Sequence, residues 1–341
     1  MRIGLLTGGG DGSAINAAIR SVVRVAIGEG FQVIGIKRGW RGLIYDEVEP
    51  LFLGSVSGIL QRGGTILGTS RTNPFNIESG VDNILVNVRK HGIDAIIAIG
   101  GDDTNGVAHR LAELGLKCVG IPQTIDNDMP GTDYSIGFDS AVQVACDALD
   151  KLHTTAFSHH RIMVLEVMGR DAGWIALISG IAGGADTILI PEVPFTLDEV
   201  IGRIERRRRI NKPFSIIVIS EGAKPAGREE QFTQNQKKDP FGHVRLGGIG
   251  NWLADEIEEK TGYETRVTHL GHLQRGGTPT VFDRVLATRL GAYAVHMIKE
   301  GEFDSMVCMC ANEVRSISYV DALIGVKHVD LSLFELAKLF F

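Results

Sequence analysis

Short runs of β-branched and aliphatic residues recur along this chain, separated by intervals long enough to hold a helix. The seven runs lie at Ile3–Thr7, Gln32–Lys37, Ala95–Ile99, Cys118–Pro122, Arg161–Val167, Thr187–Ile190 and Ser215–Ser220. Apolar runs of this length bounded by turn residues are typical of buried strands, and helix-sized intervals between them are typical of parallel crossovers. The alternation therefore predicts an α/β chain with mostly parallel sheets flanked by helices.

The size and composition of the chain predict a large globular protein. Its 341 residues are 44% hydrophobic and 22% charged, which favours two lobes over one. The net charge of −6 argues against nucleic-acid binding. The basic run at 206–209 lies in a helical pattern typical of a solvated face, with contact to a phosphate effector or a subunit as the alternative.

Other sequence features indicate the cellular compartment in which the protein works. No apolar stretch is long enough to span a membrane, and the first residues form no visible signal peptide. The four cysteines fit neither a disulfide framework nor the common zinc spacings. We therefore expect a cytoplasmic protein.

Two acidic clusters follow two of the predicted strands. Residues 100–104 (Gly-Gly-Asp-Asp-Thr) follow the run at 95–99, and residues 124–128 (Thr-Ile-Asp-Asn-Asp) follow the run at 118–122. Open parallel sheets bind their ligands at the carboxyl ends of the strands, so the two clusters should lie together.

The carboxylates of these clusters suit the transfer of a phosphoryl group. Asp102 and Asp103 fit Mg²⁺, which takes one or two carboxylates plus substrate phosphates, although a polar helix cap is the alternative. Asp126 and Asp128 point the same way if the chain is extended there. One would then accept a proton from a hydroxyl, while the other orients it or holds metal.

Phosphate binding also needs cations and backbone donors. The glycine-rich turn at 8–12 precedes a helical pattern, so its amides and the helix amino end could face an anion, although such turns also serve packing. Five arginines near glycines or strand ends suit phosphate as well as surface ion pairs: Arg71, Arg161, Arg170, Arg266 and Arg275. The pairs His159-His160 and His269/His272 lack a third metal ligand, so we expect them to form hydrogen bonds instead.

Taken together, these segments resemble the phosphofructokinase family, whose members phosphorylate the 1-hydroxyl of fructose 6-phosphate to give fructose 1,6-bisphosphate in glycolysis. The matching segments cover nearly the whole chain in family order: 6–11, 61–65, 68–74, 100–104, 124–128, 166–170, 220–222 and 270–277. Further matches at 158–161, 168–174 and 242–250 resemble the actinobacterial branch, in which pyrophosphate and ATP users both occur.

The resemblance implies a two-lobed fold with a defined division of the chain. A donor-binding lobe would comprise residues 1–139 and about 251–301. A sugar-phosphate-binding lobe would comprise about 140–250 and 302–341, with a C-terminal helix docked on the body. The polar stretch 224–239 interrupts the pattern and predicts a surface excursion or a long hairpin.

The resemblance also implies roles for individual residues. The catalytic residues would be Asp126, the base for the sugar hydroxyl, with Thr124 and Asp128 beside it, and Arg71, which would neutralise charge on the transferred phosphoryl group. Asp102 would ligate Mg²⁺. Donor phosphates would contact Gly9, Arg71, Asp102, Asp103, Thr104 and Gln123. The sugar phosphate would contact Thr124, Asp126, Asp128, Met168, Gly169, Arg170, Glu221, His272 and Arg275. Arg161 and Arg266 would reach across from a neighbouring subunit, which implies a homodimer or homotetramer with shared sites.

Position 103 bears on the phosphoryl donor. ATP users of the family carry glycine there and pyrophosphate users carry aspartate, because a carboxylate would crowd and repel a nucleotide α-phosphate. Pyrophosphate users also carry lysine at the position of Gln123, so this chain lacks one cation of that pocket. The sequence favours pyrophosphate, with ATP as the alternative.

The turn at 12–15 (Gly-Ser-Ala-Ile) also departs from the family, where Pro-Gly is usual, and Ser13 is predicted to cap the helix that follows. This departure, together with Gln123, leaves open a catalytically reduced subunit that binds sugar phosphates for regulation. A lipid or NAD kinase shares the Gly-Gly-Asp turn but gives no reason for the segments 168–170 and 272–275.

Overall fold

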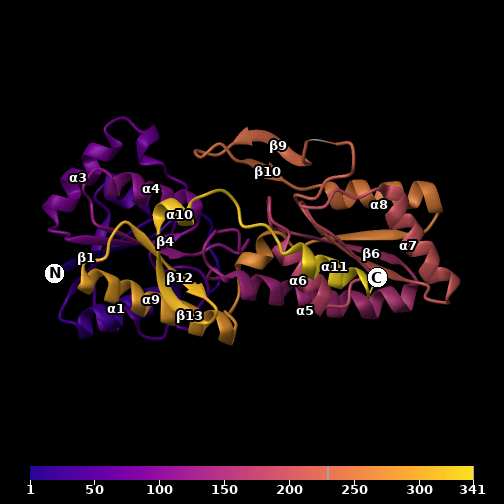
Figure 1. Cartoon of the computed structure of the whole chain (residues 1–341), viewed down its shortest axis with the longest axis horizontal. Coiled ribbons are helices and arrows are strands. Elements are labelled where there is room, and N and C mark those ends of the chain that lie inside the picture. The colour runs from indigo at the N-terminus through magenta and orange to yellow at the C-terminus, as the bar shows by residue number, and fades with distance from the viewer. Residues whose placement is uncertain (229, 341) are drawn as a thin grey trace.

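The computed structural model describes residues 1–228 and 230–340, which form two lobes that are each built around one sheet (Figure 1). The lobe with the amino terminus holds a seven-stranded sheet, and the other holds a four-stranded, fully parallel sheet. The predicted α/β architecture with two lobes is confirmed. All seven predicted strands are present within a residue or so of their predicted bounds.

The larger sheet has the strand order β13-β12-β5-β4-β1-β2-β3. Its strands are β1 (Arg2–Thr7), β2 (Gln32–Ile36), β3 (Val48–Leu51), β4 (Ala95–Gly100), β5 (Cys118–Pro122), β12 (Ser305–Cys310) and β13 (Glu313–Ser318). The two edge strands, β3 and β13, run antiparallel to their neighbours, whereas the inner strands are parallel. The acidic clusters therefore follow adjacent central strands, β4 and β5.

The central strands of this sheet are apolar on both faces because helices cover both. Ile3 and Leu5 of β1 pack on one side, in a cluster with α1 and α9, while Leu6 packs on the other. This alternation follows from the two-residue period of a strand. The helices of this lobe are α1 (Ile15–Gly28), α2 (Trp40–Ile44), α3 (Gly80–Lys90), α4 (Asp102–Ala112), α9 (Val281–Glu300) and α10 (Tyr319–Ala322).

The smaller sheet has the order β11-β6-β8-β7 and the same layered construction. Its strands are β6 (Ile162–Val167), β7 (Thr187–Leu189), β8 (Ser215–Ser220) and β11 (Thr265–His269). Its helices are α5 (Phe138–His159), α6 (Trp174–Ala182), α7 (Leu197–Arg209), α8 (Ile249–Thr261) and α11 (Leu331–Lys338). Phe334 of α11 joins the apolar cluster of α5 and α6, as the predicted docking of the C-terminal helix requires.

The division of the chain differs from the predicted one at two places. Strands β12 and β13 complete the larger sheet, although residues 302–341 were assigned to the other lobe. Helix α8 and strand β11 belong to the smaller sheet, although residues 251–301 were assigned to the first lobe. An apolar run predicts that a strand forms, but it does not say which of two sheets the strand joins.

The polar stretch 224–239 forms part of a hairpin, which was one of the two structures predicted for it. Strands β9 (Thr233–Lys238) and β10 (Val244–Leu246) pair antiparallel outside both sheets. Figure 1 shows the hairpin at the top of the view, extending from the smaller-sheet lobe toward the larger-sheet lobe. Among the described residues, no helix combines the length and apolar character needed to cross a membrane.

The basic run at 206–209 lies at the end of α7. Arg206 and Arg209 are exposed as predicted, but Arg207 binds Asp186 at 2.6 Å and Arg208 lies over the ring of Tyr263. Only part of this run is therefore a solvated face.

Candidate active site

A cavity collects residues from both lobes near the carboxyl ends of β4, β5 and β6. Its lining consists of Gly9, Gly10, Arg71, Gly101, Asp102, Asp103, Thr104, Gln123, Thr124, Asp126, Asp128, Arg170 and Arg275. All six predicted donor-binding residues and all four predicted catalytic residues belong to this set. The open-sheet rule therefore placed the two acidic clusters correctly.

The first acidic cluster occupies the turn from β4 into α4. Gly101 caps the helix, and Asp102 and Asp103 lie in its first turn, where the helix dipole favours negative charge. Thr104 is buried against Gly8. A Cβ atom added to Gly8 would lie only 2.7 Å from the Thr104 hydroxyl oxygen. The glycines at the ends of β1 and β4 therefore let the two turns approach each other closely.

The second acidic cluster is a tight turn and not an extended segment. Asn127 has a left-handed backbone with φ of +53°, and its side-chain oxygen accepts a hydrogen bond from the Ser135 amide at 2.9 Å. The Asp126 amide donates to the Thr124 hydroxyl at 3.2 Å. The segment is therefore not extended, which was the condition under which Asp126 and Asp128 would point the same way, yet both residues line the cavity.

Burial sets the protonation of these carboxylates. Asp126 is only 5% exposed and its Oδ1 atom accepts no hydrogen bond from the described residues. Burial raises the pKa of Asp126, and burial with the charges of Asp126 and Asp102 raises the pKa of Asp128 to about 7. An unpartnered, buried carboxylate with a raised pKa is suited to accept a proton from a ligand.

Three arginines face the carboxylates. Arg275 donates to the Asp11 carbonyl at 3.0 Å and lies directly above Gly10. Arg170 follows Gly169 in a turn with positive φ at both residues. Its carbonyl lies where a Cβ atom of Gly222 would stand, so glycine is required at 222. Arg71 forms an ion pair with Asp239 at 2.6 Å.

A second cavity of about 240 Å³ lies at the carboxyl end of β6. It is lined by Glu166, Val167, Met168, Glu221, Gly248, Asn251, His269 and Gly271. Burial and the charge of Asp126 raise the pKa of Glu221 to about 7. The predicted residues Met168 and Glu221 lie here, whereas His272 is exposed beside Gly271 at its rim.

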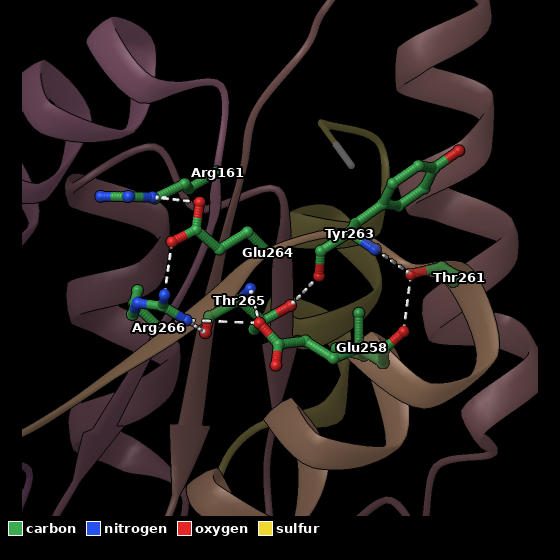
Figure 2. A network of polar contacts seen from close by, with 8 residues as sticks. Arg161, Glu258, Thr261, Tyr263, Glu264, Thr265 and Arg266 are labelled. Carbon is green, nitrogen blue, oxygen red and sulfur yellow. Dashed lines mark hydrogen bonds and ion pairs between the residues drawn. The ribbon is translucent and has the colours of Figure 1, made fainter.

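Arg161 and Arg266 lie away from both cavities. Arg161 precedes β6, whose opposite end carries Met168, so the two are roughly 20 Å apart along the strand. Figure 2 shows Arg161 and Arg266 on either side of Glu264, with Arg161 at 2.7 Å from its carboxylate. Arg266 also contacts Glu258 at 3.3 Å. Neither arginine joins the cavity of its own chain.

The turn before α1 differs from its predicted form. Ala14 is the N-cap residue, and the Ser13 hydroxyl donates to the Gly276 carbonyl at 2.9 Å. The capping role predicted for Ser13 is therefore wrong, since the hydroxyl instead ties this turn to the segment around Arg275. Gln123 is 1% exposed, and neither atom of its amide has a partner among the described residues.

One group of side chains offers atoms for a cation. Asp102, Asp103 and His243 each present one atom, and the three atoms lie within 4.8 Å of one another. The two carboxylates are the candidate ligands, because both ring nitrogens of His243 already contact Arg170 and Asp103. Carboxylate oxygens suit a hard divalent ion such as Mg²⁺. The two carboxylates were predicted from sequence, but His243 and Asp239 were not, because they lie 140 and 168 residues from their partners Asp103 and Arg71.

Comparison with known proteins agrees with this geometry. The sequence model of the family "Phosphofructokinase" matches residues 2–298. The chain is 52% identical, over the whole of both chains, to the pyrophosphate--fructose 6-phosphate 1-phosphotransferase of Amycolatopsis mediterranei. It is also 47% identical to an ATP-dependent 6-phosphofructokinase of Corynebacterium efficiens, covering 100% of this chain and 99% of the other.

A solved structure agrees as well. The phosphofructokinase of Saccharomyces cerevisiae superposes with a TM-score of 0.83 at 33% identity, over 94% of this chain and 45% of that one.

Proposed function

Because this chain belongs to the phosphofructokinase family, we propose that it transfers a phosphoryl group to the 1-hydroxyl of fructose 6-phosphate, with pyrophosphate as the donor. The observation that carries the proposal is one cavity that joins the two acidic turns to Arg71, Arg170 and Arg275. Phosphoryl transfer depends chiefly on positioning and charge neutralisation, and this cavity offers carboxylates, arginines and a free base together.

Asp126 acts as the general base. Its Oδ1 atom, which has no partner among the described residues, accepts the proton of the sugar hydroxyl. Because the pKa of Asp126 is raised, protonating it costs less free energy than protonating an exposed aspartate. Burial raises this pKa most and the charge of Asp102 adds to it, whereas Arg275 and Arg170 lower it. Asp128 lies in the same turn as the base. Arg71 and Arg170 stabilise the negative charge that spreads over the transferred group.

The donor site lies over the turn that starts α4. Asp102 would ligate Mg²⁺, with Asp103 nearby, and the ion would neutralise donor phosphates when bound. The Gln123 amide is buried and has no partner among the residues that the structure describes, so it supplies a hydrogen-bond donor to a donor phosphate. Gly9 and Thr104 complete the wall of the site.

Asp103 selects pyrophosphate. Its carboxylate lines the cavity in the first turn of α4, so a nucleotide would have to place its α-phosphate against a negative charge. Burial and the charge of Asp102 raise the pKa of Asp103, so solvent screens its charge only in part. The ATP-dependent relative and the absence of a cation at Gln123 favour ATP as the second candidate donor.

Arg170 and Arg275 contact the sugar phosphate from the first cavity. The second cavity binds the rest of it, with Met168 and Glu221 in the lining, Gly169 next to Met168, and His272 at the rim. Its lining contains two carboxylates and His269 but no arginine or lysine, which suits sugar hydroxyls better than a phosphate. The missing cations are supplied by Arg161 and Arg266 of a second subunit, since both side chains lie away from the cavity of their own chain. The active enzyme is therefore a homodimer or homotetramer in the cytoplasm.

The larger-sheet lobe then holds the donor, and the smaller-sheet lobe holds most of the sugar phosphate. Tight binding of fructose 6-phosphate without turnover would instead support a regulatory subunit.

The test measures formation of fructose 1,6-bisphosphate from fructose 6-phosphate and Mg²⁺, with pyrophosphate and ATP supplied in parallel. We expect turnover with pyrophosphate, and a shift toward ATP in Asp103→Gly. Turnover of the wild type with ATP alone would refute the donor assignment. Turnover with neither donor would refute the proposed reaction.

A further inference from the structure

The tip of the β9–β10 hairpin is a turn closed by hydrogen bonds. Asp239 accepts hydrogen bonds at 3.0 Å from the amides of Phe241 and His243, and its carbonyl accepts from the Gly242 amide at 2.9 Å. Gly242 has φ of +93°, and Pro240 follows Asp239. Proline and glycine at these positions are typical of a type I turn followed by a bulge, which fixes the direction of the last residue, His243.

This tip is carried by the smaller-sheet lobe but docks on the larger-sheet lobe. The Asn76 side chain donates to the Pro240 carbonyl at 3.0 Å, and Arg71 pairs with Asp239 at 2.6 Å. Phe241 packs against the apolar cluster that α2, α3 and α4 form on the larger sheet. Three contacts therefore hold the tip against the larger-sheet lobe, toward which the hairpin extends (Figure 1).

His243 links two residues of the active-site cavity that come from different lobes. Its Nδ1 atom lies 2.6 Å from the Arg170 guanidinium, and its Nε2 atom lies 3.2 Å from Asp103 Oδ2. A guanidinium offers donors only, so Nδ1 must accept and the ring proton must sit on Nε2. That proton is then donated to Asp103, which gives a directional chain from Arg170 through His243 to the carboxylate.

We propose that the turn at residues 239–243 is the outer wall of the donor site, and that His243 is a positioning residue that fixes Asp103 and thereby sets the choice of phosphoryl donor. The proposal rests on the function proposed above and deepens it. With His243 in place, the Asp103 carboxylate is held at the mouth of the cavity, where a nucleotide would need to pass. Without it, Asp103 is free to turn away, and Arg170 loses the partner that aims it.

Asp239 has a parallel effect on the opposite side of the site. It joins Arg71 to the same turn that aims His243, so one loop orients a cation for the donor phosphates and the carboxylate that rejects nucleotides. This arrangement also explains how donor selection persists when position 123 carries an uncharged amide.

The test compares His243→Phe with His243→Gln in the full-length protein. Phenylalanine keeps a ring but removes both nitrogen atoms, whereas glutamine retains one acceptor and one donor. We expect His243→Phe to lower kcat/KM for pyrophosphate at least tenfold, mainly through KM for the donor. The preference for pyrophosphate over ATP should fall at least as much, while KM for fructose 6-phosphate changes less. Glutamine should restore part of the preference.

Thr233→Ala, at an exposed position of β9, serves as the matched control and should keep the wild-type preference. A merely structural role for His243 would lower activity with both donors equally and would show no rescue by glutamine, and either result would overturn the proposal. Calorimetric titration of pyrophosphate with Mg²⁺ gives a readout that does not need turnover. Weaker binding to His243→Phe than to the wild type supports the donor wall even if the proposed reaction fails, and equal binding refutes it.

Discussion

Replacement of Asp128 by asparagine is expected to stabilise the protein, and the gain should depend on pH. Burial and the charges of Asp126 and Asp102 raise the pKa of Asp128 from 3.8 to about 7. One pKa unit corresponds to about 1.4 kcal/mol of difference between the two protonation states. Ionised Asp128 therefore lowers the free energy of unfolding by up to about 4 kcal/mol. Because the residue retains some contact with solvent, we expect about 2–3 kcal/mol.

The direction of the pH dependence follows from the raised pKa. The folded state holds the Asp128 proton more tightly than the unfolded state. The decrease in the free energy of unfolding that ionised Asp128 causes is therefore absent well below pH 3.8. This decrease in the free energy of unfolding grows as the pH rises toward about 7 and is constant above that value. Asparagine is neutral throughout, so Asp128→Asn should raise the melting temperature by several degrees at pH 8.5 and by less at pH 5.

Thermal unfolding of wild type and Asp128→Asn at both pH values, with chelator present, measures the effect. Asp255→Asn makes the same chemical change at an exposed position of α8 and should leave the melting temperature unchanged. An equal rise in melting temperature at pH 5 and pH 8.5 would show that packing, and not charge, is responsible. Loss of stability at pH 8.5 would refute the electrostatic reasoning. Turnover should fall in the same variant, because Asp128 lies in the same turn as the base.

Three further outcomes are expected. Asp126→Asn should lower kcat by roughly 10²–10⁴-fold with little change in KM for the donor, and an unchanged kcat in steady-state kinetics would exclude it as the base. Gln123→Lys places a cation beside the donor phosphates and should raise kcat/KM for pyrophosphate roughly tenfold or more, whereas a decrease would place the amide outside the donor's reach. Arg161→Ala should be inactive alone but regain activity in mixed oligomers with Asp126→Asn if sites are shared, and hybrids without activity would mean that each subunit is self-sufficient.

The sequence predicted the parts of this molecule whose causes are local. Strand β4 is recognisable because it is a continuous apolar run. The acidic turn after it is recognisable because ligands bind at the carboxyl ends of the strands in open parallel sheets. The assignment of β12 to a sheet failed because neighbours in a sheet are chosen by long-range packing. Whether residues 126–128 are extended could not be decided from the sequence, because the left-handed turn at Asn127 is accompanied by a contact with Ser135.

The residues of the hairpin tip were missed for a related reason. The Asp-Pro-Phe-Gly sequence at 239–242 predicts a tight turn, but nothing local says that this turn reaches a site in the other lobe. The contact between His243 and Asp103 joins positions 140 residues apart. Sequence alone therefore identifies the turn, whereas only the assembled lobes give His243 its role.

Charge balance in the cavity bears on the form in which the donor binds. Four aspartates line it, at 102, 103, 126 and 128, against three arginines. Arg71 is already paired with Asp239, and Arg170 donates to His243. Pyrophosphate alone would add negative charge to a site that holds a surplus of carboxylates, and its desolvation would be poorly compensated. A divalent cation bound to the donor reverses that balance, so we expect the magnesium complex of pyrophosphate to bind far more tightly than free pyrophosphate.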